Sequence, residues 1–140
     1  MPVNSGSLIG NVSFFFLLPL FLMNALVKPL AGLLGVVLLA VGVLGFFMDP
    51  ILGIFDVNQL HNIIHVASGL VGLGAAASGY GLSRTYLIVF GLVYAVVALL
   101  GFIGLPLVVS LLNVNAADNY LHMAIAAVCL VVGFGSSRNA

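Results

Sequence analysis

Charged residues are nearly absent from this sequence. Only 4% of the 140 residues carry a charge and glutamate does not occur, whereas roughly 25% of the residues in a soluble domain are charged. Hydrophobic residues make up 64% of the chain, so the polar side chains are too few to cover a surface in water. The shortage of charge therefore excludes an ordinary soluble domain and predicts a protein whose main solvent is lipid.

Other absences narrow the possible functions. The formal net charge is zero, which leaves no basic surface for nucleic acid or for anionic lipid headgroups. Cys129 is the only cysteine and lies in an apolar run, so we expect a packed small side chain and no intramolecular disulfide. No nucleophile, phosphate-loop or dinucleotide motif occurs. The sequence therefore predicts a protein that is not an enzyme.

The chain does contain an internal repeat. The segment 34–46 matches 90–102 at an offset of 56 residues. After one inserted residue, NQLHNIIH (58–65) recurs as NAADNYLH (115–122) at an offset of 57. A repeat places its polar residues at equivalent depths in two halves of one fold.

Hydrophobic runs predict four membrane-crossing helices. The run 29–48 has 20 uncharged residues, enough for a helix to cross ~30 Å of hydrocarbon. The other helices are predicted at about 58–77, 86–104 and 116–134, with connectors at 51–57 and 105–114 and a loop at 78–84. The predicted fold is an all-α integral membrane protein, a four-helix bundle of two parallel helical hairpins.

The predicted domain organisation is one membrane domain with an N-terminal extension. The hairpins cover 29–84 and 85–140, and the apolar segment 1–28 stands outside the repeat. Residues 8–27 are expected to form either an interfacial helix or a fifth crossing. These alternatives place the N-terminus on opposite sides of the membrane.

The few charges separate along the chain. Basic residues flank the two hairpins, and acidic residues lie in or beside the connectors. The basic residues are Lys28, Arg84 and Arg138, and the acidic residues are Asp49, Asp56 and Asp118. The positive-inside rule predicts that the basic residues are cytoplasmic and that the connectors lie on the outer side.

Small residues recur at helical spacing and at equivalent places in the repeat. Close approach through such residues supplies van der Waals contact between helices in lipid. We therefore expect the two hairpins to pack face to face through them. The candidate packing glycines are Gly35, Gly42, Gly45, Gly69, Gly72, Gly91, Gly101 and Gly133.

Two polar stripes begin the second and fourth predicted helices. Steps of three and four residues place each stripe on one helix face. The first stripe is Asn58, His61, Asn62 and His65, and the second is Asn115, Asp118, Asn119 and His122. Asn58 and Asn115 are predicted helix caps. Because unpaired polar groups are costly in lipid, both stripes are expected to face the bundle interior.

Three interpretations of the stripes remain open. The preferred one is a hydrogen-bonded clasp, in which Asn62 and Asn119 are candidate partners of the histidines. The second is a metal site, for example for zinc. Its ligands would be His61, His65, Asp118 and His122. The third makes His65 and His122 axial ligands of a haem or a chlorophyll-type pigment.

The segment FDVNQLHNIIHVASGLVG (55–72), followed by NAADNYLH (115–122), resembles a bacterial membrane family catalogued as domain of unknown function 4383. The LGF ending of the first and third helices adds to the resemblance, which covers about 30–135. It implies a compact integral membrane protein and no assigned activity. The expected location is a bacterial inner or photosynthetic membrane.

The expected function is that of a small, non-catalytic accessory subunit. Its partners would be membrane lipids, including bound lipid, and other integral membrane proteins of a respiratory or photosynthetic complex. One alternative is a cofactor-binding protein that uses His65 and His122. Another is a transporter of a small solute or lipid, which would require a continuous polar path.

Overall fold

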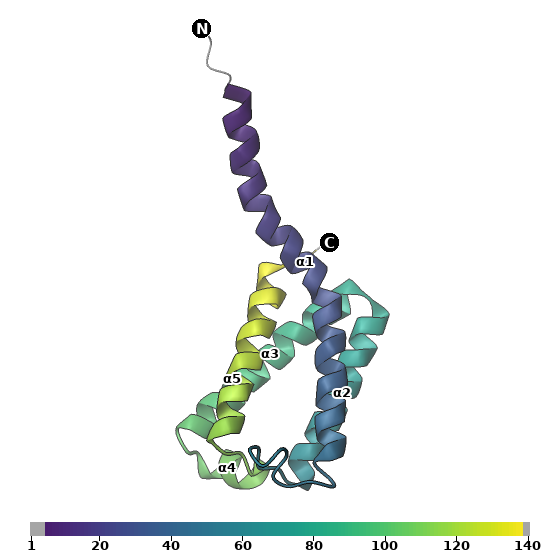
Figure 1. Cartoon of the computed structure of the whole chain (residues 1–140), viewed down its shortest axis with the longest axis vertical. Coiled ribbons are helices and arrows are strands. Elements are labelled where there is room, and N and C mark those ends of the chain that lie inside the picture. The colour runs from purple at the N-terminus through teal and green to yellow at the C-terminus, as the bar shows by residue number, and fades with distance from the viewer. Residues whose placement is uncertain (1–4, 139–140) are drawn as a thin grey trace.

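The computed structural model describes the backbone of residues 5–138 and the side chains of residues 18–138. Five helices form in this part of the chain (Figure 1). They are α1 (Ser5–Leu44), α2 (Gln59–Ser78), α3 (Tyr80–Phe102), α4 (Pro106–Leu112) and α5 (Ala116–Gly135). Segments of α1, α2, α3 and α5 are long and apolar enough to cross a membrane, with Leu18–Leu44 as the segment in α1. The predicted all-α, four-helix membrane bundle is confirmed.

The apolar N-terminal segment is not a separate element. α1 is one helix of 40 residues that contains Pro19 and Pro29, and its N-terminal half extends past the bundle (Figure 1). The prediction of a helix over 29–48 therefore placed the start too late and the end four residues too late. Prolines interrupt helices in water, but a long apolar segment favours continued helix because lipid offers its backbone no other partners.

The loop predicted at 78–84 is wrong. Gly79 alone separates α2 from α3, with a φ of 125° that favours glycine. The Ser83 hydroxyl donates to the carbonyls of Ala75 and Gly79 at 3.0 and 2.9 Å. The same two carbonyls also accept from the backbone N–H groups of Gly79 and Ser83. Together these bonds tie the end of α2 to the first turn of α3, so the reversal needs no longer loop.

The two connectors differ. The first, between α1 and α2, is irregular, whereas most of the second is α4, which starts with Pro106. Proline suits the first turn of a helix because its missing N–H has no helical partner there. A single inserted residue between Pro106 and Asn115 thus accompanies a change from loop to helix.

The glycines bring helices together mainly within each hairpin. A Cβ added to Gly35 would lie 2.7 Å from the Leu73 nitrogen, and one on Gly69 would lie 2.5 Å from the Leu39 nitrogen. In the second hairpin, a Cβ on Gly91 would meet Leu130 of α5 at 2.8 Å. Gly42, Gly45, Gly101 and Gly133 also face the other helix of their own hairpin.

The expectation that these glycines join the two hairpins face to face is therefore wrong for most of them. The exception is Gly72, whose Cβ would lie 2.7 Å from the Tyr86 ring across the α2–α3 boundary. Antiparallel neighbours in a hairpin run side by side over their whole length, so they have more to gain from close backbone approach than the crossing contacts between hairpins.

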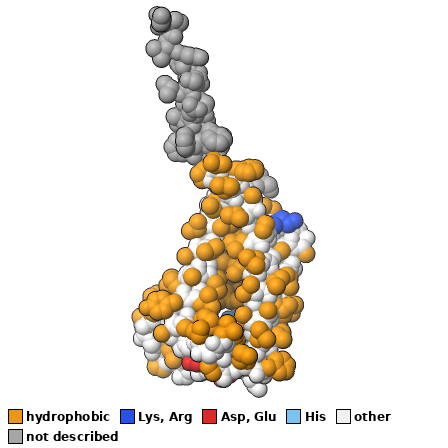
Figure 2. Space-filling model, in the orientation of Figure 1, with side chains coloured by type: hydrophobic (Ala, Val, Ile, Leu, Met, Phe, Trp, Pro, Cys, Tyr) orange, Lys and Arg blue, Asp and Glu red, His pale blue; other side chains and the backbone are white. Residues whose placement is uncertain are grey.

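Acidic and basic side chains lie at opposite ends of the bundle. Arg84 stands beside the C-terminal end of α5, where its Nε donates to the Ser136 carbonyl at 3.4 Å. Asp49 lies in the first connector and accepts a bond from the Val57 N–H at 3.1 Å. Apolar side chains cover most of the face between these ends (Figure 2). This surface is that of a multi-pass membrane protein, while the assignment of each end to a compartment stays a prediction.

Candidate metal centre

Matched caps fix the start of both polar stripes. The Asn58 side chain accepts a hydrogen bond from the His61 N–H at 2.9 Å, and Asn115 accepts one from the Asp118 N–H at 3.1 Å. The Asp118 carboxylate in turn accepts from the Asn115 N–H at 3.0 Å and completes a capping box. The caps fix the residue at which α2 and α5 begin, so both stripes start at the same point of their helices.

The same two asparagines tie the hairpins to each other. The Asn58 amide donates to the Leu111 carbonyl at 2.9 Å, and the Asn115 amide donates to the Ile54 carbonyl at 2.8 Å. Ile54 and Leu111 are 57 residues apart, the same offset as the caps, so the two bonds are repeat equivalents. Each cap therefore fastens the connector of the opposite hairpin.

Asn62 and Asn119 do not serve the histidines as the clasp interpretation expected. Each amide lies against a glycine of its own hairpin: a Cβ on Gly45 would be 2.6 Å from the Asn62 Cγ, and one on Gly101 would be 2.6 Å from the Asn119 Cγ. The Oδ1 atoms of both amides are buried without a hydrogen-bond partner. The asparagines thus face the first helix of each hairpin and do not form hydrogen bonds with the histidines.

Three histidines meet where the hairpins join. His61 and His65 come from α2 and His122 comes from α5, and they are only 2%, 7% and 3% exposed. One ring nitrogen from each can be chosen so that all three lie within 4.8 Å of one another. The ring centroids are 4.4 Å apart for His61 and His65, and 5.8 and 6.2 Å for His122 with these two. The stripes therefore converge on one small volume.

The groups around this volume lack hydrogen-bond partners. The Nδ1 atoms of His65 and His122 and the Tyr94 hydroxyl are buried without one. Neither ring nitrogen of His61 makes a hydrogen bond of ordinary geometry, although the Leu112 backbone lies close to it. An unsatisfied buried polar group costs about 1–3 kcal/mol. A single species bound between the three rings would supply the missing partner to several of these groups at once.

Asp118 stands beside this cluster and not in it. Its carboxylate is engaged by the cap of α5, and it does not belong to the three-residue group whose donor atoms converge. The four-ligand set expected from the sequence therefore reduces to the three histidines. Asp118 is nevertheless only 2% exposed. The basic residues lie at the other end of the bundle, too far away to compensate the charge of its carboxylate.

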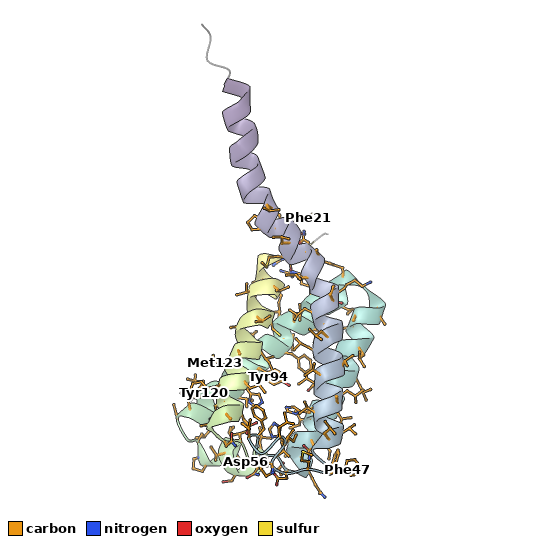
Figure 3. All side chains as sticks on the ribbon, in the orientation of Figure 1. Phe21, Phe47, Asp56, Tyr94, Tyr120 and Met123 are labelled. Carbon is orange, nitrogen blue, oxygen red and sulfur yellow. The ribbon has the colours of Figure 1, made fainter. Side chains whose placement is uncertain are left out.

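Tyr94 is a member of the site that the sequence analysis missed. It lies inside the bundle, toward the connectors (Figure 3), with its ring centroid 5.2 Å from that of His122. The sequence did contain a signal for it, because the repeat equivalent of Tyr94 is Leu38. A hydroxyl group thus occurs in one copy of the repeat where the other copy has an aliphatic side chain.

Two cavities flank the histidines, with volumes of about 200 and 40 Å³. His65 and His122 line both of them. All ten residues around the smaller cavity have their repeat equivalents in the wall of the larger one. The two cavities therefore occupy equivalent positions with respect to the internal repeat. The pairs that differ most in chemistry, with the residue of the smaller cavity first, are His61 and Asp118, Ser68 and Ile125, and Tyr94 and Leu38.

A porphyrin does not fit this arrangement. A macrocycle between His65 and His122 would occupy the place of His61, whose ring centroid is 4.4 Å from that of His65. The cavities of about 200 and 40 Å³ are also below the roughly 300–1,000 Å³ of pockets that hold cofactor-sized ligands. The donor set suits a single ion better than a pigment.

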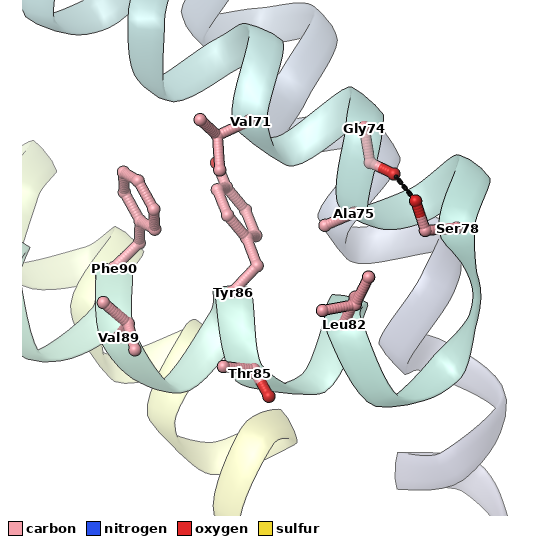
Figure 4. Close-up of a pocket in the computed structure, with 9 residues that line it drawn as sticks. All are labelled: Val71, Gly74, Ala75, Ser78, Leu82, Thr85, Tyr86, Val89 and Phe90. Carbon is pink, nitrogen blue, oxygen red and sulfur yellow. Dashed lines mark hydrogen bonds between the residues drawn. The ribbon is translucent and has the colours of Figure 1, made fainter.

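A third hollow lies nearer the α2–α3 reversal, and Phe90 borders both this hollow and the smaller cavity. The hollow is an open groove of about 330 Å³ between α2 and α3, lined by residues such as Leu82, Tyr86, Val89 and Phe90 (Figure 4). Its lining contains no histidine, cysteine or carboxylate. The groove faces the surroundings of the protein and has no donor set for an ion.

Residues 28–135 match the model of a family described as a domain of unknown function (DUF4383). No curated protein and no solved structure matches this chain.

Proposed function

Because the chain belongs to the DUF4383 family, whose activity is unassigned, we propose a function from the site itself: a small multi-pass membrane protein that binds one transition-metal ion. The ligands are His61, His65 and His122. The observation that supports this is the convergence of three buried imidazoles, each with at least one ring nitrogen that has no hydrogen-bond partner. The resemblance noted over 30–135 agrees with the family match.

The ligand set defines the class of ion. Neutral imidazole nitrogens suit zinc, copper, nickel and iron, whereas magnesium and calcium require oxygen ligands. Metal–nitrogen bonds of ~2.0–2.1 Å place two donors of a tetrahedral site roughly 3.4 Å apart. The three nitrogens, now within 4.8 Å of one another, would have to move inward through small changes of side-chain torsion. Three protein ligands leave a fourth position open.

Charge also favours a cation at this place. A carboxylate in an apolar bundle is expensive unless a positive charge lies near it. Asp118 precedes His122 by one helical turn, and it shares the wall of the larger cavity with His65 and His122. A cation held by the histidines would compensate this carboxylate, and the carboxylate would offset part of the charge of the ion.

The test is metal analysis of the protein purified in mild detergent with an affinity tag that contains no histidine. We expect close to one equivalent of zinc or copper, removable by a chelator. His61→Gln, His65→Gln and His122→Gln should each lower metal affinity by about tenfold or more. The control is Cys129→Ala, which removes the only thiol, buried two turns further along α5, and should leave the metal content unchanged.

Two results would contradict this function. One is wild-type protein that takes up no ion when zinc, cobalt(II) or copper(I) is offered at micromolar concentration, in which case a buried water serves the imidazoles. The other is a variant with all three histidines changed to glutamine that retains the wild-type metal content. Cobalt(II) binding to the wild-type protein, measured by its visible absorption, tests the site without relying on the folding of any variant.

A second role is proposed alongside the first, namely lateral association with another integral membrane protein. It is supported by the part of α1 that extends past the bundle, where Phe21 is 69% exposed (Figures 1 and 3). Native gels and crosslinking in the source membrane should detect a complex larger than the chain. A lone monomer in both experiments would refute this role without bearing on the metal.

A further inference from the structure

The two cavities beside the histidines are lined by repeat-equivalent residues but differ in polarity and in volume. On the small side, the wall carries the imidazole of His61 and the hydroxyls of Ser68 and Tyr94. At the equivalent places, the large side has Asp118, Ile125 and Leu38. An aromatic ring thus gives way to a shorter aliphatic chain, and the volume rises from about 40 to about 200 Å³.

The position of His61 orients the open coordination position. His65 and His122 border both cavities, whereas His61 borders only the small one. An ion bound by all three therefore has its ligands gathered toward the small cavity. In tetrahedral geometry, the fourth position points away from the three occupied ones, which is toward the large cavity.

We infer that the large cavity admits a compact, neutral, largely apolar molecule, which occupies the fourth coordination position of the ion with a single donor atom. This inference depends on the proposed metal site. Aside from His65, His122 and Asp118, the wall consists of aliphatic side chains and Phe55. Such a wall gives no partner to a charged or strongly polar ligand, and Asp118 disfavours an anion.

The size of the cavity limits the ligand. An apolar cavity of about 150 Å³ lined by similar side chains stays dry and binds benzene or xenon. A cavity of about 200 Å³ therefore accepts a molecule up to roughly the size of a single six-membered ring. Molecules of this class partition into lipid and can reach the site from the membrane.

Pyridine and benzene form a matched pair of probes. They have the same ring, but only pyridine has a nitrogen that can coordinate a metal. Added to the cobalt(II)-loaded protein, pyridine should change the visible ligand-field spectrum in a saturable way. Benzene should leave that spectrum unchanged on its own and should displace pyridine competitively.

Leu38→Phe tests the location. Tyr94 shows that an aromatic ring is accommodated at the equivalent place in the other cavity, and the ring introduced by this substitution would fill the large cavity in the same manner. Pyridine affinity should fall by about tenfold or more, with the cobalt spectrum in the absence of pyridine unchanged. Leu34→Phe, whose repeat equivalent is Phe90, is a second filling variant. Val89→Phe fills the groove of Figure 4, which shares no lining residue with the large cavity, and is the control that should bind pyridine normally.

The outcomes separate this inference from the proposed function. If cobalt(II) binds but pyridine leaves its spectrum unchanged, the metal site stands and the ligand cavity is refuted. Equal pyridine affinity in the wild type, Leu38→Phe and Leu34→Phe would also refute the cavity. If cobalt(II), zinc and copper(I) all fail to bind, the proposed function fails first and this inference falls with it.

Discussion

Gly45 and Gly101 have no room for a side chain. In both hairpins, an added Cβ would overlap the amide group of an asparagine on the neighbouring helix, Asn62 or Asn119. The two contacts repeat with the same separation to the amide carbon, 2.6 Å. The glycine and the asparagine therefore form one packing unit that the repeat has kept in both copies.

Alanine at either glycine should destabilise the protein. Gly45→Ala and Gly101→Ala should each cost about 1–3 kcal/mol, the usual cost of forcing an extra methyl group into a packed interior. The measurement is thermal unfolding in detergent. Gly74→Ala is the control, because a Cβ at Gly74 meets nothing within 4 Å and alanine favours helix by about 1 kcal/mol. Equal unfolding temperatures for the three variants would refute the packing unit.

Individual residues were predictable where a local rule applied. The asparagine caps follow from helix-end chemistry, and the depth of the histidines follows from counting along the helix. The partners of the histidines were not predictable. They depend on which way α2 and α5 face each other, and Asn62 was expected to serve a histidine, whereas the structure turns it toward Gly45.

At the scale of elements, each cap has two separable tasks. Asn58→Ala removes both the acceptor for the His61 N–H and the donor to the Leu111 carbonyl, and it should cost about 1–2 kcal/mol. Asn58→Ser keeps a neutral capping acceptor but is too short to donate to the Leu111 carbonyl, so its unfolding temperature should lie between those of the alanine variant and the wild type. Wild-type stability in Asn58→Ser would show that the bond to the opposite connector contributes nothing.

Helix existence was predictable from the apolar runs, but helix ends were not. The uncharged run that begins after Lys28 led to a boundary there, and the glycines and serines of 78–84 led to a loop. In the structure, α1 passes through Pro29 and α3 begins at Tyr80. In lipid, backbone N–H and C=O groups without hydrogen bonds cost more free energy than an imperfect helix does. A local sequence pattern does not reveal this cost.

At the scale of the whole molecule, the charges predict orientation. In a Cys129→Ala background, Gly81→Cys should react with a membrane-impermeant thiol reagent only from the cytoplasm, and Ile54→Cys only from the other side. Gly81 lies near Arg84, and Ile54 is 55% exposed in the first connector. Reaction of both cysteines from the same side would contradict the crossing of the membrane by α2, and the reverse labelling pattern would contradict the orientation predicted from the charges.

The parallel repeat is the part of the architecture that sequence comparison alone could establish, because matching segments at offsets of 56 and 57 are visible without coordinates. The pairing of helices is another matter. Glycines at equivalent positions were compatible with packing between or within hairpins, and only their distances to Leu73, Leu39 and Leu130 distinguish the two.

The single residue between α2 and α3 has a consequence for assembly. Exchange of hairpins between two copies of the chain would require Gly79 to straighten, fusing Gln59–Ser78 and Tyr80–Phe102 into one rod. Such a rod, at ~1.5 Å per residue, would be roughly twice as long as the hydrocarbon layer is thick, and its apolar ends would enter water. The bilayer thus opposes this exchange, and we expect every polypeptide to build its own histidine cluster.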